Sequence, residues 1–161
     1  QFAFLLPKSE LTPVVVEGES RTVVSMAGDD GAPREPAPSE APVAAAAPSG
    51  ETVDVPLIRL AWGRSGDKGD ISNIGLIARK PAYLPYLRHA LTPERVREWL
   101  GHLVKGPVTR YDLPGIGAMN FVCEQALGGG GMASLRNDPL GKGMAQILLS
   151  MPVTMPVSEL Q

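Results

Sequence analysis

The segment 25–52 limits most strongly what this chain can fold into. It is rich in Ala, Pro, Gly, Ser and acidic residues and contains no aromatic residue. Such a composition cannot bury enough apolar surface to offset the entropy lost on ordering, so we predict a disordered linker. The part of the chain able to build a core is then confined mainly to residues 53–157, the length of one small domain.

Residues 1–24 precede this linker and carry a different pattern. Two runs rich in β-branched residues, 14–16 and 22–24, flank a turn centred on Gly18. The spacing predicts a β-hairpin. Because two strands alone are marginally stable in water, we interpret this piece as the hairpin-like tail of a preceding domain.

Short apolar runs alternate with glycine and proline breaks from residue 53 onward. The clearest helix is expected over 92–105, where Thr92 can cap a helix that has Pro93 at its first position. Its apolar residues recur at helical spacing from Val96 to Val104. Further helices are expected over 81–91, where Pro85 limits the length, and over 138–151. Strands are expected over 55–62, 108–112 and 152–157, and 71–78 is either a strand or a short buried segment. Residues 118–127 are ambiguous between strand and helix, and we favour a strand because 120–123 lies between glycine breaks. This interleaving predicts an α+β domain, a ferredoxin-like α/β sandwich with a mixed sheet.

Charge is distributed unevenly along the chain. Residues 53–157 hold twelve Lys and Arg against eight Asp and Glu, whereas residues 1–52 hold three against eight. A modestly basic domain suits an anionic small ligand or an acidic neighbour. The lack of a Lys/Arg run and the few aromatic residues argue against nucleic acid. The single cysteine excludes an internal disulfide, and no apolar run approaches a membrane span, so we expect a soluble cytoplasmic protein.

The densest polar cluster is the glycine-rich stretch 63–70, which we interpret as a loop. Three glycines at a spacing of three allow backbone N–H groups to turn inward around an anion. Arg64 and Lys68 would add positive charge, while Asp67 and Asp70 would orient them or accept a ligand hydroxyl. The alternative is an exposed turn rich in solvated charges. Ser65 and Lys68 also match an S-x-x-K nucleophile pair, which we treat as accidental because the glycines disfavour the required helix.

Two further groups of residues are candidates for ligand contacts. We expect Arg110, Tyr111 and Asp112 at a strand end, where polar side chains can face a ligand. The alternative is that Arg110 and Asp112 pair with each other. Arg136 and Lys142 flank the start of the helix expected over 138–151, a favourable place for phosphate or carboxylate. The glycine run 128–131 lacks the context of a dinucleotide fold, and 141–143 lacks that of a P-loop. We therefore expect no cofactor. The sequence has no Cys/His cluster of the kind that binds a metal ion, so we predict no metal site.

Four long sequence segments carry a resemblance to a known family. They span Leu60–Asp70, Asn73–Arg79, Arg110–Phe121 and Ala126–Arg136. In this order they resemble the C-terminal domain of the acyclic terpene utilization AtuA family, over about residues 55–156. The resemblance implies a ferredoxin-like fold and a role in catabolism of acyclic terpenes through acyl-CoA intermediates. It also implies a large N-terminal domain as partner, in cis or in trans.

We therefore expect an accessory domain of an acyl-CoA-processing enzyme whose main catalytic residues lie outside this chain. The expected contacts are a CoA thioester, the large N-terminal domain and further copies of the chain in a homo-oligomer. A non-catalytic assembly module is the alternative, and a free-standing hydrolase using Ser65 is a third interpretation. The candidate ligand-binding or interface residues are Arg64, Ser65, Asp67, Lys68, Asp70, Asn73, Arg110, Tyr111, Asp112, Asn120, Arg136 and Lys142.

Overall fold

The computed structural model describes residues 6–7, 10–24 and 41–160. The chain divides into two compact units, residues 1–38 and 39–161, which are treated separately. In the first unit, β1 (Val14–Glu17) pairs antiparallel with β2 (Ser20–Val23). Gly18 forms the turn with a φ of +60°, which confirms the predicted hairpin. The role as tail of a preceding domain stays a prediction, and residues 25–40 of the predicted linker lie outside the described residues.

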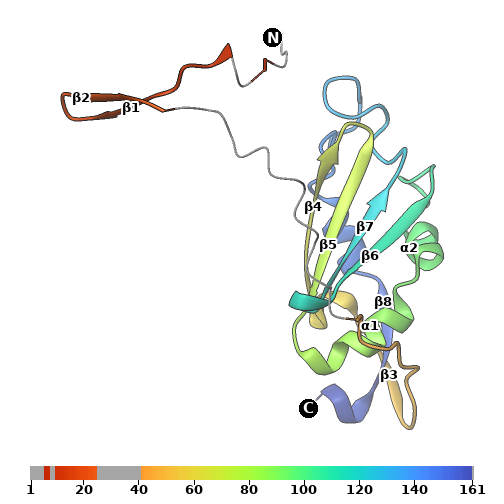
Figure 1. Ribbon diagram of the computed structural model, residues 1–161. Helices are drawn as coiled ribbons and strands as arrows, with labels where there is room; N and C mark the ends of the chain where they lie inside the picture. The colour runs from red at the N-terminus through yellow and green to blue at the C-terminus, as the bar shows by residue number, and fades with distance from the viewer. Residues whose placement is uncertain (1–5, 8–9, 25–40, 161) are drawn as a thin grey trace. The chain divides into compact units, whose positions relative to one another are not determined.

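The second unit contains most of the regular structure (Figure 1). Its strands are β3 (Thr52–Pro56), β4 (Ala61–Lys68), β5 (Ile71–Ala78), β6 (Val108–Leu113), β7 (Ala118–Cys123) and β8 (Pro152–Pro156). Its α-helices are α1 (Leu84–Ala90), α2 (Pro93–Trp99) and α3 (Met144–Leu149). Short 3-10 turns η2 (Leu57–Arg59), η3 (Pro81–Tyr83), η4 (Pro114–Ile116) and η5 (Val157–Leu160) connect or end these elements.

The main sheet has four strands in the order β4-β5-β7-β6. β7 lies between β5 and β6, so these two strands run in the same direction without pairing. Together with the helices that connect them they form the split βαβ unit of a ferredoxin-like fold, as predicted. The expected mixed sheet needs one correction: every strand pairing among the described residues is antiparallel. The helical connection suggests that β5 and β6 form a parallel pair, but β7 lies between these two strands.

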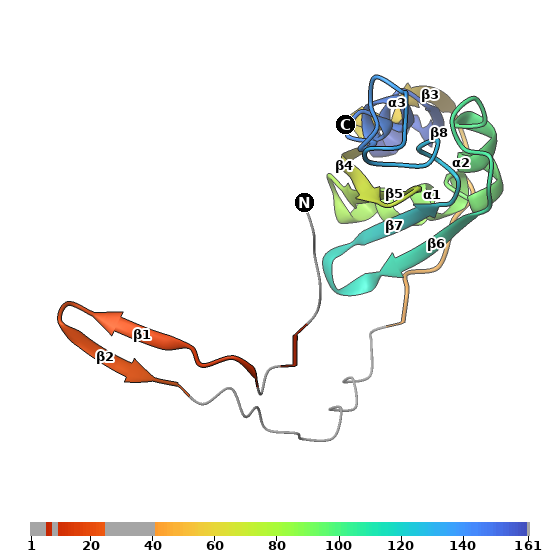
Figure 2. The ribbon, with the colours of Figure 1, turned by 90° about the horizontal axis from the view of Figure 1, so that it is seen from above.

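The helices and the small sheet β3-β8 lie on one side of the main sheet, and the opposite side is left open (Figure 2). The core fills the space between them, because β5 turns Ile74 and Leu76 inward and β7 turns Met119 and Phe121 inward. The helices contribute Leu87, Val96 and Leu148 from their apolar faces. Within the described part of the second unit, no other element therefore covers the second face of the four-stranded sheet.

Several predicted elements differ from the structure. The expected strand 55–62 is interrupted by η2, so its two ends belong to β3 and β4 in different sheets, and the expected strand 118–127 ends at Cys123. The stretch 63–70 is not a loop: residues 61–68 form β4, whose antiparallel register with β5 is continuous from Ala61↔Ala78 to Lys68↔Ile71. The helix begins at Pro93 as predicted, with Thr92 Oγ1 accepting from Arg95 N at 3.3 Å, but ends at Trp99. Turns then carry the buried Leu100 and Val104, and the following Gly101 weakens helical continuation.

The helix expected over 138–151 starts only at Met144. Residues 138–143 form a turn because Asp138 accepts hydrogen bonds from the backbone of Lys142 at 2.8 Å and Gly143 at 2.7 Å. Gly141 has a φ of +61°, which is incompatible with a continuous right-handed helix. Lys142 therefore precedes the helix and does not belong to its first turn.

The last part of the predicted linker contacts the second unit. Arg88 donates to the carbonyl oxygen of Val43, and the backbone N–H of Ala46 donates to Pro85 O at 3.0 Å. Val43 and Ala46 thus lie beside α1, before β3 begins at Thr52. Among the described residues, no helix is both long enough and apolar enough to cross a membrane.

Candidate functional site

Strand β4 separates the polar residues of the predicted loop onto two faces. Ser65 points inward and is buried, with its Oγ donating to Lys142 O at 3.1 Å and accepting from Ala145 N at 2.9 Å. Arg64 and Lys68 point to the opposite, open face and are exposed. The hydroxyl of Ser65 therefore fastens β4 to the start of α3, and the S-x-x-K spacing does not bring a lysine to it.

Asp70 organises the four-glycine loop. Its Oδ1 accepts from the backbone of Leu127 at 3.0 Å and Gly129 at 2.8 Å, and its carbonyl oxygen accepts from Ala126 N at 2.9 Å. All four glycines of 128–131 have positive φ. At Gly130 a Cβ would lie 1.9 Å from Gly69 O, so only glycine fits against the turn. Asp70 therefore has a structural role in joining two loops.

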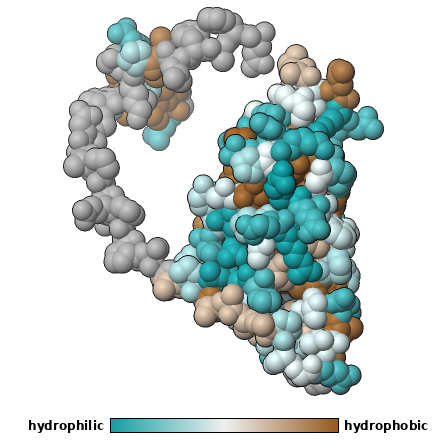
Figure 3. All heavy atoms as spheres, turned by 90° about the vertical axis from the view of Figure 1, so that its right-hand side faces the viewer, coloured by the Kyte–Doolittle hydropathy of each residue, from teal (hydrophilic) through white to brown (hydrophobic). Residues whose placement is uncertain are grey.

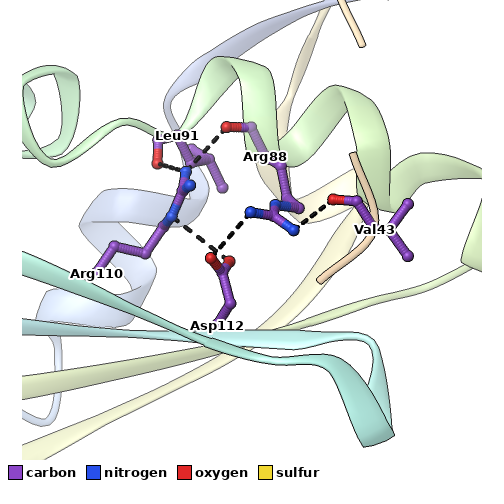
Figure 4. A network of polar contacts seen from close by, with 5 residues as sticks. All are labelled: Val43, Arg88, Leu91, Arg110 and Asp112. Carbon is purple, nitrogen blue, oxygen red and sulfur yellow. Dashed lines mark hydrogen bonds and ion pairs between the residues drawn. The ribbon is translucent and has the colours of Figure 1, made fainter. Parts of the chain in front are cut away.

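Arg110 and Asp112 lie on the covered side of the sheet, and they pair with each other (Figure 4). Asp112 also binds Arg88, with 3.0 Å between Oδ2 and Nη2. Arg110 Nη1 donates to the carbonyl oxygens of Arg88 at 2.9 Å and Leu91 at 3.0 Å, which satisfies the C-terminal end of α1. This network ties α1 to β6. Tyr111, between the two, points to the open face and is exposed.

Arg136 and Lys142 do not share one recess. The Arg136 guanidinium donates to the carbonyl oxygens of Ala126 and Leu103, the latter at 3.2 Å, and thus holds its own loop. Lys142 instead extends toward β4, with its Nζ 3.8 Å from Asp67 Oδ1. Its side chain is more than half exposed.

Several of the predicted residues do meet on the open face of the main sheet. The register aligns Arg64 with Gly75, Gly75 with Asn120, and Asn120 with Tyr111, across all four strands. In the adjacent row Asn73 accepts from the side-chain amide of Asn120 at 3.5 Å. Four strands thus contribute one continuous polar band.

Two recesses flank this band and share Arg64, Gly75 and Asn120. The apolar recess, about 370 Å³, is lined further by Trp62, Ile77, Leu113, Ile116 and Ala118. The polar recess, about 510 Å³, is lined further by Ser65, Gly66, Asp67, Lys68, Asn73 and Lys142. Each volume lies within the ordinary range of small-molecule sites. Because the two recesses share residues, we treat them as one groove across the open face.

The charge of the groove is concentrated at one end. The polar recess has three cationic side chains, Arg64, Lys68 and Lys142, and one carboxylate, Asp67. Asp67 is already paired with Lys142. Among the described residues, neither Arg64 nor Lys68 has a hydrogen-bond or ion-pair partner. The polar recess therefore offers positive charge that the domain itself does not use.

The residues that line the groove decide which chemistry its side chains can offer. No histidine or cysteine is among its lining residues, and its only buried hydroxyl, Ser65, is engaged by the backbone. Cys123 lies in the core, where burial raises the pKa of its thiol to about 11. No group of three or more His, Cys, Asp or Glu in the described ranges is arranged to hold a metal ion.

The predicted site missed the apolar half of the groove. Trp62, Ile77, Leu113 and Ala118 form one cross-strand row, and the Arg79 guanidinium lies 4.8 Å from the centroid of the Trp62 ring. The prediction of a loop at 63–70 overlooked that outward side chains alternate along this stretch, from Trp62 through Arg64 to Lys68. A period of two, applied through the glycines, was the available signal.

Comparison with known proteins identifies a family. The model of a family described as the AtuA ferredoxin-like domain matches residues 55–154, which covers β4, β5, β6, β7 and all three α-helices. No curated protein and no solved structure matches the chain significantly.

Proposed function

Because this chain belongs to the AtuA ferredoxin-like domain family, we propose that it is an accessory domain of a cytoplasmic enzyme of acyclic terpene or branched acyl-CoA catabolism. In this proposal the open face of the main sheet is the surface that the domain contributes, and its ligand is a CoA thioester. The main catalytic residues then lie outside this chain.

The groove on the open face is the observation that supports this function. An acyl-CoA combines an apolar acyl chain with an anionic phosphate-bearing portion. The groove places an apolar recess beside a recess with Arg64, Lys68 and Lys142. The positions of Arg110, Asp112 and Arg136 in internal contacts leave the open face as the better surface for a ligand than the other predicted contacts.

Isothermal titration calorimetry with an acyl-CoA tests the proposal. Arg64→Ala and Lys68→Ala should each weaken binding about tenfold, the value of one charge-assisted contact of roughly 1.4 kcal/mol. Arg59→Ala is the matched control, because Arg59 is exposed and lines neither recess. Equal affinities for the wild type and all three variants would reject CoA-thioester binding on this face.

A non-catalytic assembly module is the second candidate, supported by the apolar side chains that the open face exposes. Trp62, Tyr111 and Ile116 are each more than half exposed. Such side chains suit a contact with the larger AtuA-type domain or with another copy of this chain. Trp62→Ser combined with Ile116→Ser should then abolish co-purification with that domain, or convert an oligomer into a monomer in light scattering. A wild-type chain that stays monomeric and does not co-purify excludes this candidate.

A further inference from the structure

We propose that the groove binds an elongated amphipathic anion in one orientation. The apolar chain lies in the Trp62 recess, the ligand crosses over Gly75, and the anionic group lies near Arg64, Lys68 and Lys142. This inference rests on the proposed function and deepens it by specifying the ligand's shape and direction. A free carboxylate and the phosphates of a CoA ester share the required chemistry.

Gly75 is the first support for this orientation. It sits inside β5 between Ile74 and Leu76, which both point into the core, so position 75 faces the open side. A Cβ there would meet only Arg64 O, at 3.9 Å, and the φ of Gly75 is not positive. Neither packing nor backbone conformation requires glycine. Glycine in a strand interior weakens the strand and often marks close approach by a ligand, which fits its place in both recesses.

Gly63 provides the contrast within the same sheet. It faces the core, where a Cβ would lie 2.9 Å from Leu76 Cδ2 and 3.1 Å from Leu149 Cδ1. Packing of α3 against β4 therefore explains glycine at 63. At 75 the missing side chain instead keeps the floor of the groove low at the point where its two recesses join.

The ends of the groove differ in chemistry and are fixed by the strand. Trp62, Arg64 and Lys68 share one face of β4, so alternate positions lie about 7 Å apart and Trp62 lies about 20 Å from Lys68. Lys142 reaches the cationic end from a rigid turn, because its N–H donates to Asp138 and its carbonyl oxygen accepts from Ser65. A ligand with one apolar and one anionic end therefore matches the groove in a single direction.

The test compares Gly75→Val with Thr109→Val by calorimetry against decanoate, decanoyl-CoA and free CoA. Thr109 is exposed on the same sheet face but lines neither recess, which makes it the matched control. Gly75→Val should fold at least as stably as the wild type, because valine favours strands. It should weaken binding of decanoate and decanoyl-CoA at least tenfold, and Thr109→Val should leave both unchanged. Unaltered binding by Gly75→Val overturns the inference. A wild type that binds neither decanoate nor decanoyl-CoA overturns it as well.

Tryptophan fluorescence provides a readout that does not depend on the Gly75 variant. The chain has two tryptophans, so Trp99→Phe leaves Trp62 as the only emitter. Decanoate should shift Trp62 emission to the blue, and an unshifted spectrum at saturation contradicts the orientation.

The three ligands separate the inference from the proposed function. Binding of decanoate that Gly75→Val weakens, without tighter binding of decanoyl-CoA, supports the amphipathic groove and rejects the CoA-thioester function. Equal binding of free CoA and decanoyl-CoA, unaffected by Gly75→Val, retains CoA recognition and overturns the inference.

Discussion

At the scale of single residues, burial decides what Cys123 can do. Its side chain ends β7 on the core side and is fully buried. A thiolate in that position would lose its hydration, so burial raises the pKa of Cys123 from its ordinary value of 9.0 to about 11. The thiol is thus a small apolar group at neutral pH and a poor nucleophile.

This pKa shift predicts a pH-dependent loss of stability. Between pH 9 and 11 the unfolded chain releases the thiol proton while the folded chain retains it, so the free energy of unfolding falls as pH rises. The loss should approach about 3 kcal/mol above pH 11. Urea denaturation of wild type and Cys123→Ala, followed from pH 8 to 11, measures it. The difference between the two curves should diminish with pH, and parallel curves would contradict the prediction.

At the scale of elements, the contact between the β4–β5 turn and the glycine loop leaves no room for a side chain at Gly130. Asp70 accepts two backbone hydrogen bonds from the loop, and Gly130 packs directly on the Gly69 carbonyl. Met132 and Leu135 project from the same loop with fully exposed side chains. Hydrophobic atoms protrude at the upper end of the domain in Figure 3, where Figure 1 places these turns.

Gly130→Ala should destabilise the domain by about 3 kcal/mol, because both the Cβ clash with a backbone atom and the φ of +68° oppose alanine. Gly131→Ala is the matched control: its φ is +44°, but nothing lies within 4 Å of its Cβ. That variant should lose only about 1 kcal/mol, the cost of a left-handed residue. Urea denaturation of both variants measures the two losses, and equal losses would show that the close approach to Gly69 is not rigid.

Element prediction from the sequence succeeded where local chemistry and hydrophobic period agree. The Gly18 turn, the Thr92 cap and strand β7, which lies between glycine breaks, are examples. It failed at β4, where glycines and charges suggest a loop but pairing with β5 supplies the hydrogen bonds that keep the strand. For the site, Arg64 and Lys68 were found by their charge, whereas Gly75 and Ile116 carry no local signal until strands distant in sequence lie side by side.

At the scale of the whole second unit, the Arg88–Asp112–Arg110 network adds polar contacts between parts of the chain that are far apart in sequence. It connects the C-terminal end of α1, the edge strand β6 and, through the carbonyl oxygen of Val43, the segment before β3. The three side chains are mostly shielded from solvent. Their charges are therefore costly to leave without a partner.

Asp112→Ala should destabilise the domain by about 2 kcal/mol, because it leaves two shielded guanidinium groups without their counter-charge. Glu98→Ala, at an exposed position of α2, should change stability by less than about 0.5 kcal/mol. Thermal unfolding followed by circular dichroism compares the two variants. Binding to the groove should survive in folded Asp112→Ala, since Asp112 lies on the other side of the sheet; loss of both properties together would connect the network to the groove.

The two-sided character of β4 has a consequence for how such domains diversify. Residues 61, 63 and 65 are tied to the core and to α3, so changes there are felt by the fold. Residues 62, 64 and 68 face outward and are free of those constraints. Substitutions at the outward positions of β4 can therefore change what the open face contacts while the core stays the same. The same positions can be redesigned without repacking the domain.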